Sequence, residues 1–187
     1  MKKGYLAALA TVLLLGASSL AQAAPFTFNF SLLPAGGAIK GEAGALTGWG
    51  YRIENQDGIN WFVATDISAS SFALGVPDAS FFDFPIIGPG AFATQAFDAA
   101  LLTGLFGVNI LAGALPGQSE GGVFTLGGEW WSGDPLGAGS FLRVADPATG
   151  AFSLTVIGGP TVVPEPSTFW LLVFALPLLA RRVQSAR

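Results

Sequence analysis

The chain of 187 residues contains no cysteine and no histidine. Without cysteine it can form no disulfide, no cysteine nucleophile and no thiolate zinc site, and without histidine it can form no Ser-His-Asp triad. Charged residues make up only 11% of the chain, about half the usual share, which excludes a coiled coil and a disordered polyelectrolyte. Carboxylates are the catalytic side chains that remain, and we expect that the protein is not an enzyme.

The first 23 residues have the three parts of a secretory signal peptide. Lys2 and Lys3 form a positive start, residues 5–15 form an apolar run, and Ala21 and Ala23 provide a small-x-small cleavage site. We expect export by the Sec machinery and cleavage after Ala23 by signal peptidase. The alternative is an uncleaved membrane anchor, but a run of eleven residues is short for a bilayer core of about 30 Å.

The C-terminal end combines the triplet Pro164-Glu165-Pro166, an apolar segment at about 167–180 and a basic tail at 181–187. The triplet stays extended, because each proline lacks a backbone donor and restricts the residue before it. The apolar segment predicts a single helix in the membrane, with Arg181 and Arg182 stopping it on the cytoplasmic side. A helix buried in the globular domain is the alternative, since the segment spans a bilayer only if the arginine side chains snorkel.

These three parts, in this order and together with a signal peptide, resemble the PEP-CTERM sorting signal of Gram-negative bacteria. The resemblance covers residues 163–187. It implies recognition by an exosortase, a membrane-embedded cysteine transpeptidase-like protease, with cleavage near the triplet. It also implies transient anchoring in the inner membrane, a final place at the cell surface or in the extracellular matrix, and a link with exopolysaccharide or biofilm. Family members are mostly non-enzymatic surface proteins, so we expect a structural or adhesive role.

Residues 24–163 predict one all-β body, an antiparallel β-sandwich or jelly roll. Polar and apolar residues alternate at 26–32, 49–53 and 59–67, and further strands are expected at 81–87, 91–97, 105–111, 122–131 and 151–157. The Asp57-Gly58 turn predicts that residues 46–67 form a hairpin. Alternation also predicts that Trp130 faces the core, while Trp131 is the more exposed.

This body carries three basic residues against eleven acidic ones, a net charge of −8. We therefore expect no nucleic-acid partner. Asp134 with Asp146, or Asp78 with Asp83, are candidate ligands for Ca²⁺, which binds carboxylates in many extracellular β-domains. Capping of turns by these side chains is the favoured interpretation, so no cofactor is expected.

Two hypotheses name a ligand for the body. In a carbohydrate-binding module for the exopolysaccharide, exposed aromatic rings would stack on sugars, and the candidates are Trp49, Tyr51, Trp61 and Trp131. A glycoside hydrolase would need two carboxylates roughly 5–9.5 Å apart. Glu54 and Asp66, on adjacent strands of the expected hairpin, and Glu129 are the candidates for this chemistry. Any acidic β-protein offers such pairs, so solvated carboxylates are the simpler interpretation.

Overall fold

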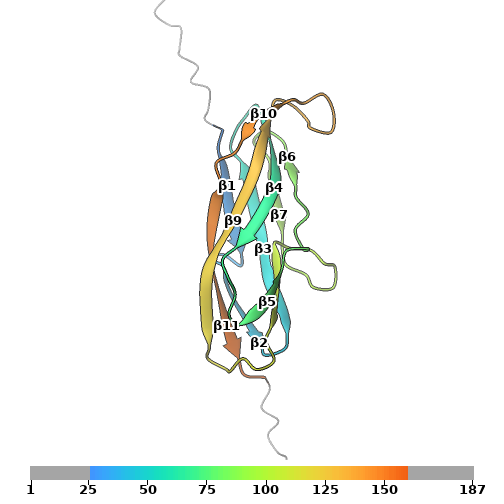
Figure 1. The fold of residues 1–187 in the computed structure, drawn as a ribbon. Coiled ribbons are helices and arrows are strands. Elements are labelled where there is room, and N and C mark those ends of the chain that lie inside the picture. The colour runs from blue at the N-terminus through green and yellow to red at the C-terminus, as the bar shows by residue number, and fades with distance from the viewer. Residues whose placement is uncertain (1–25, 160–187) are drawn as a thin grey trace, which may run out of the picture.

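The computed structural model describes residues 26–159, which form two β-sheets that face each other (Figure 1). This confirms the prediction of an all-β body. No helix in this range is long and apolar enough to cross a membrane. The segments expected at 1–23 and 164–187 lie outside the described residues, and with them Ala21, Ala23, Pro164, Glu165, Pro166, Arg181, Arg182 and the apolar helix.

The first sheet is built around β3 (Leu46–Asn55). On one edge β3 pairs with β1 (Phe28–Leu33), and on the other it pairs with β8 (Phe106–Ile110) and then β7 (Phe92–Gln95). Strand β5 (Gly75–Asp78) extends the sheet beyond β8. All of these pairings are antiparallel.

The second sheet is built around β9 (Ser119–Trp131). Strand β4 (Trp61–Ala69) pairs on one edge of β9, while β11 (Ala148–Ile157) and the short β10 (Phe141–Val144) pair on the other. The outermost strands are β6 (Ile86–Ile87) beside β4 and β2 (Ala38–Glu42) beside β11.

Strand β2 runs parallel to β11, so the second sheet is mixed and the expected wholly antiparallel arrangement is wrong at this edge. Strands β2, β5 and β10 were not predicted from the sequence. Each has only four or five residues, and β2 and β5 carry charged side chains or proline, which hide the alternation that marks a strand.

The predicted hairpin at 46–67 is also wrong, because β3 and β4 belong to different sheets. The connection between them crosses from one sheet to the other, and Asn55 at its start is fully buried. The side-chain amide of Asn55 donates to the carbonyl oxygens of Asn60, Ile87 and Gly88, at 2.8, 3.2 and 3.0 Å. A buried amide needs such partners, and a two-stranded hairpin in solvent would not supply those at 87 and 88.

Asp57 stabilises the same connection between β3 and β4 through hydrogen bonds within it. Its carboxylate accepts hydrogen bonds from the backbone of Ile59 and from the backbone and side chain of Asn60, at 2.8, 2.9 and 3.0 Å. Burial opposes the charge on Asp57, but these donors outweigh it, so the pKa of Asp57 lies below its usual value. The turn residues recognised in the sequence therefore form a connection between sheets.

An aromatic core fills the space between the sheets. Trp49 of β3 contacts Phe124 of β9 and Phe152 of β11, with ring centroids 5.1 and 5.0 Å apart. Nearer the other end, Phe62 of β4 contacts Trp130 at 5.3 Å. Aromatic pairs in these tilted and edge arrangements stabilise a core beyond the area they bury.

Trp130 and Trp131 face opposite sides of β9, as the alternation predicts. Trp130 is 1% exposed, whereas Trp131 is partly exposed. Strand β9 pairs with β4, and the register shift between the two lies in β4, between Ala64 and Asp66. The alternation along β9 is therefore uninterrupted.

The described chain enters and leaves the elongated body at opposite ends (Figure 1). Strand β1 begins at the end that carries β10 and the start of β4. Strand β11 leads out at the other end, beside β2. The described chain ends at Gly159 beside β2, at the end of the body away from the start of β4 and the end of β9.

Candidate functional site

Two of the four aromatic candidates for sugar stacking lie in the core. Trp49 is 0% exposed and Tyr51 is 2% exposed. The indole N–H of Trp49 donates to the carbonyl of Gly37 at 2.7 Å, and the hydroxyl of Tyr51 donates to the carboxylate of Asp83. Burial, together with the hydrogen bond and charge of Asp83, raises the pKa of Tyr51 above its usual value. The hypothesis that these two rings stack on sugars is wrong, because they fill the space between the sheets.

The other two candidates, Trp61 and Trp131, lie directly opposite each other on β4 and β9. Both point outward, since their neighbours Phe62 and Trp130 point into the core, and both are partly exposed. The six-membered ring of Trp61 lies over Gly88, where an added Cβ would be 3.6 Å from the ring.

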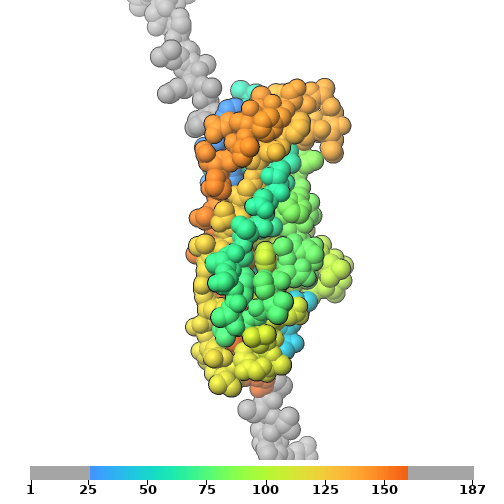
Figure 2. Space-filling model, viewed as in Figure 1, coloured from blue at the N-terminus to red at the C-terminus, as the bar shows by residue number. Residues whose placement is uncertain are grey.

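Phe141 of β10 extends this pair into a row across three strands. It is the register partner of Trp131, it is 51% exposed, and its ring meets the indole edge-on, with 6.1 Å between the ring centroids and 83° between the ring planes. We call Trp61, Trp131 and Phe141 the aromatic row. Figure 2 shows β4 at the surface of the molecule, with the segment after β9 lying across its end. Phe141 was not a candidate from the sequence, because β10 was not predicted.

Two carboxylates share the outer face with the aromatic row. Glu129 precedes Trp131 by two residues, and its Oε2 accepts the indole N–H at 3.3 Å. Asp66 lies beside Gly127 across β4 and β9, with its Cβ 3.4 Å from where a Cβ on that glycine would stand. Both carboxylates therefore lie along the strands that carry the row.

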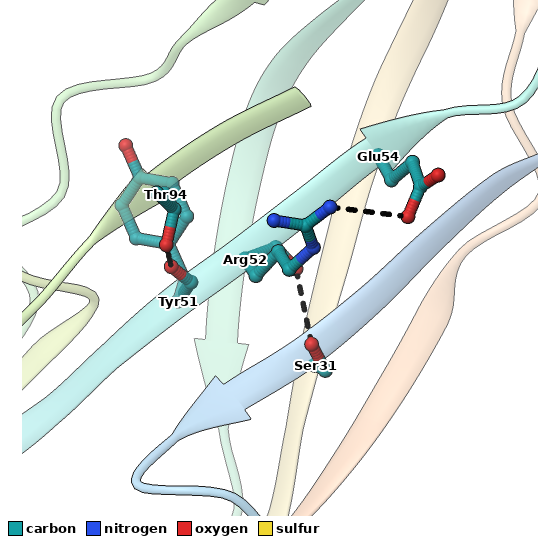
Figure 3. A network of polar contacts seen from close by, with 5 residues as sticks. All are labelled: Ser31, Tyr51, Arg52, Glu54 and Thr94. Atoms are coloured by element: carbon teal, nitrogen blue, oxygen red, sulfur yellow. Dashed lines mark hydrogen bonds and ion pairs between the residues drawn. The ribbon is translucent and has the colours of Figure 1, made fainter. Parts of the chain in front are cut away.

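The three candidates for glycoside hydrolysis are not brought together. Glu54 belongs to the first sheet, where it forms an ion pair with Arg52 at 3.6 Å (Figure 3). Asp66 and Glu129 belong to the second sheet. The expectation that Glu54 and Asp66 lie on adjacent strands is wrong, because it depended on the hairpin.

Figure 3 shows how Arg52 is held on the outer side of the first sheet. Its carbonyl accepts from the hydroxyl of Ser31 at 3.5 Å, and its guanidinium lies 4.0 Å from the centre of the Phe92 ring. Thr94 donates to the carbonyl of Tyr51 at 3.2 Å beside it. These contacts stiffen the pairing of β1, β3 and β7.

The calcium candidates have partners within the protein. The carboxylate of Asp134 accepts from the backbone of Leu136, that of Asp78 from the backbone of Ser80, that of Asp83 from Tyr51, and Asp146 pairs with Arg143. Hydrogen bonds from Ser80 hold the pKa of Asp78 below its usual value. Among residues 26–159 no three acidic side chains gather as a metal site would require.

Residues 117–121, Gly-Gln-Ser-Glu-Gly, match the Gly-x-Ser-x-Gly spacing of hydrolase nucleophiles. In those enzymes the serine lies on a turn from a strand into a helix and is activated by histidine. Here Ser119 begins β9, so the motif leads into a strand, and the chain has no histidine. Glu120 instead accepts the backbone N–H groups of Ala73 and Leu74, at 2.6 and 3.0 Å. The segment therefore has a structural role.

An apolar hollow of 430 Å³ lies elsewhere, at the turn after β1. Its lining residues are Leu33, Pro34, Gly48, Ala96 and Phe97. None of these side chains is polar, so the hollow offers no side chain for catalysis.

Comparison of the chain with protein-family models, with curated proteins and with solved structures found no match. The function is therefore inferred from the two chain ends and from the outer face of the second sheet.

Proposed function

We propose that the protein is exported, sorted by an exosortase, and adheres to the extracellular matrix or cell surface. The observation that carries the sorting step is the sequence 164–187, with its Pro-Glu-Pro triplet, apolar segment and terminal arginines, in a chain that starts with a signal-like sequence. The end of the described chain beside β2 is compatible with this proposal, because a membrane anchor after it would leave the opposite end of the body, where β4 begins at Trp61 and β9 ends at Trp131, facing away from the membrane.

Deletion of Pro164–Pro166 tests the sorting step. We expect the variant to stay in the membrane fraction of the native host, while the unmodified chain reaches the surface or medium. Deletion of residues 160–162 shortens the chain equally and leaves the sorting signal at 163–187 intact, so it is the control. Unchanged release after removal of the triplet would contradict exosortase sorting.

We further propose that the body binds polysaccharide through the aromatic row. Rings that point outward from neighbouring strands offer flat apolar surfaces on which the C–H faces of sugars stack, and aromatic side chains lose little conformational freedom when they bind. The row lies on regular strands above a packed core, which holds its rings in position before a ligand arrives. This is the specific observation that favours a carbohydrate-binding module over a purely structural role.

Affinity electrophoresis of the purified chain in gels that contain neutral, acidic or amine-bearing polysaccharides tests this second proposal. We expect retardation in at least one gel, and its loss in the variants Trp61→Ala and Trp131→Ala. The control is Phe92→Ala, which removes an exposed aromatic residue (55% exposed) from the opposite sheet. Circular dichroism establishes that each variant is folded. If the unmodified chain migrates in every polysaccharide gel as it does in a gel without polysaccharide, polysaccharide binding is contradicted. If Phe92→Ala reduces the retardation as much as the tryptophan variants do, binding by the aromatic row is contradicted.

A further inference from the structure

We infer that the aromatic row takes a polysaccharide that carries free amino groups, such as a polymer with glucosamine units. This inference rests on the proposed polysaccharide binding and names its ligand class. Stacking on Trp61, Trp131 and Phe141 accepts many sugars, so selection must come from the polar groups beside the rings. On this face those groups are carboxylates.

Glu129 is placed to act on a sugar that stacks against Trp131. One carboxylate oxygen accepts the indole N–H at 3.3 Å, and within the described part of the chain no hydrogen bond occupies the other oxygen. An ammonium group could donate to that free oxygen in a charge-assisted bond, which is shorter and stronger than a neutral one. Glu129 therefore positions the ring and also presents a charge to the ligand.

Asp66 adds a second negative charge on the same face. It lies beside Gly127, two residues before Glu129 on β9, which is about 7 Å along the strand. The sugar units of a chain that follows the strand from the aromatic row would pass both carboxylates.

The nearby cation does not neutralise this face. The guanidinium of Arg143 lies 5.7 Å from the centre of the Phe26 ring and 3.6 Å from the carboxylate of Asp146, so it is engaged on the other side of β10. The body as a whole carries −8, which repels uronic-acid and sulfated polymers and attracts cationic ones. Charge complementarity therefore favours an amine-bearing chain over an acidic or a neutral one.

The test compares three soluble probes on the purified full chain by isothermal titration at low salt. The pH is about 5.5, which lies above the reference values of carboxyl groups and below those of amines. The probes are glucosamine oligomers, their N-acetylated counterparts of equal length, and polygalacturonate with and without Ca²⁺. We expect glucosamine oligomers to bind at least about tenfold more tightly than the acetylated ones, the size of one charge-assisted contact. The preference should shrink as salt screens the charges.

Two variants separate charge from stacking. Glu129→Gln keeps an oxygen that can accept the indole N–H of Trp131 but removes the charge, so it should abolish most of the preference for glucosamine while leaving binding of the acetylated oligomer unchanged. Glu54→Gln removes a carboxylate from the opposite sheet. It should change neither the preference for glucosamine nor the binding of the acetylated oligomer.

The outcomes distinguish the proposed ligand class from the proposal that the body binds polysaccharide at all. Equal affinity for both oligomers, no effect of Glu129→Gln on the preference, or tighter binding of polygalacturonate would overturn the ligand class and leave polysaccharide binding in place. A lack of binding to every probe and to every polysaccharide gel would overturn both.

Discussion

The two adjacent tryptophans of β9 differ in what surrounds their rings. Trp130 packs between the sheets against Phe62 and Phe28, whereas Trp131 contacts only Phe141 among the aromatic rings of the described chain. We expect Trp130→Ala to lower the free energy of unfolding by about 3–5 kcal/mol, as large aromatic deletions in cores do. Trp131→Ala should cost less than about 1 kcal/mol. Urea melts of both variants measure the difference. An equal loss of unfolding free energy in the two variants, or a larger loss in Trp131→Ala, would show that Trp130 is not the residue of β9 that faces the core.

A single carboxylate also gives the fold a pH dependence. The lowered pKa of Asp57 means that its ionised form stabilises the folded state above the unfolded value of about 3.9, and that this contribution is lost as pH falls through the folded pKa. We expect Asp57→Asn to lower the free energy of unfolding at pH 7 by about 1–3 kcal/mol, because donors from Ile59 and Asn60 lose a charged acceptor.

The difference between the unmodified chain and Asp57→Asn should shrink as the pH falls below the unfolded pKa of an aspartate, about 3.9, and through the lower folded pKa of Asp57. Urea melts across this pH range provide the measurement. The control is Asp66→Asn, which changes an exposed carboxylate. At each pH its free energy of unfolding should be nearly equal to that of the unmodified chain. A pH-independent difference for Asp57→Asn would mean that the ionised form has no special role.

At the scale of elements, the decisive feature is that β3 and β4 pair with different partners. The chain has no cysteine, so introduced pairs report neighbouring strands without interference. We expect disulfides to form between cysteines at 31 and 52 on β1 and β3, and at 68 and 125 on β4 and β9, since these residues are register partners. Cysteines at 52 and 63, which would face each other in a hairpin, lie on different sheets and should stay reduced. Non-reducing electrophoresis after mild oxidation, with mass mapping, distinguishes the two arrangements.

At the scale of the whole molecule, one core joins both sheets. Buried residues from β3 and β8 in the first sheet pack with residues from β4, β9 and β11 in the second. Neither sheet can keep its inner face buried without the other, so we expect a single cooperative unfolding transition. Tryptophan fluorescence, which reports the core, and far-ultraviolet circular dichroism, which reports the strands, should give the same urea midpoint. Two separated midpoints would show that one sheet persists alone.

The sequence by itself determined the all-β class and the facing of β9. Both follow from period-two alternation, which depends only on the geometry of a strand and is therefore local. The same reasoning placed Trp130 inside and Trp131 outside. The C-terminal resemblance is likewise a property of sequence and stays a prediction about sorting.

Only the tertiary structure decided how the strands pair and which tryptophans are exposed. The turn residues at 55–58 suit a hairpin and a connection between sheets equally well, and the difference depends on acceptors at Ile87 and Gly88, about thirty residues away. Trp49 and Trp61 both lie in alternating segments, yet the second sheet covers one and solvent reaches the other. Alternation defines two faces of a strand, but which face is buried depends on packing between segments far apart in the chain.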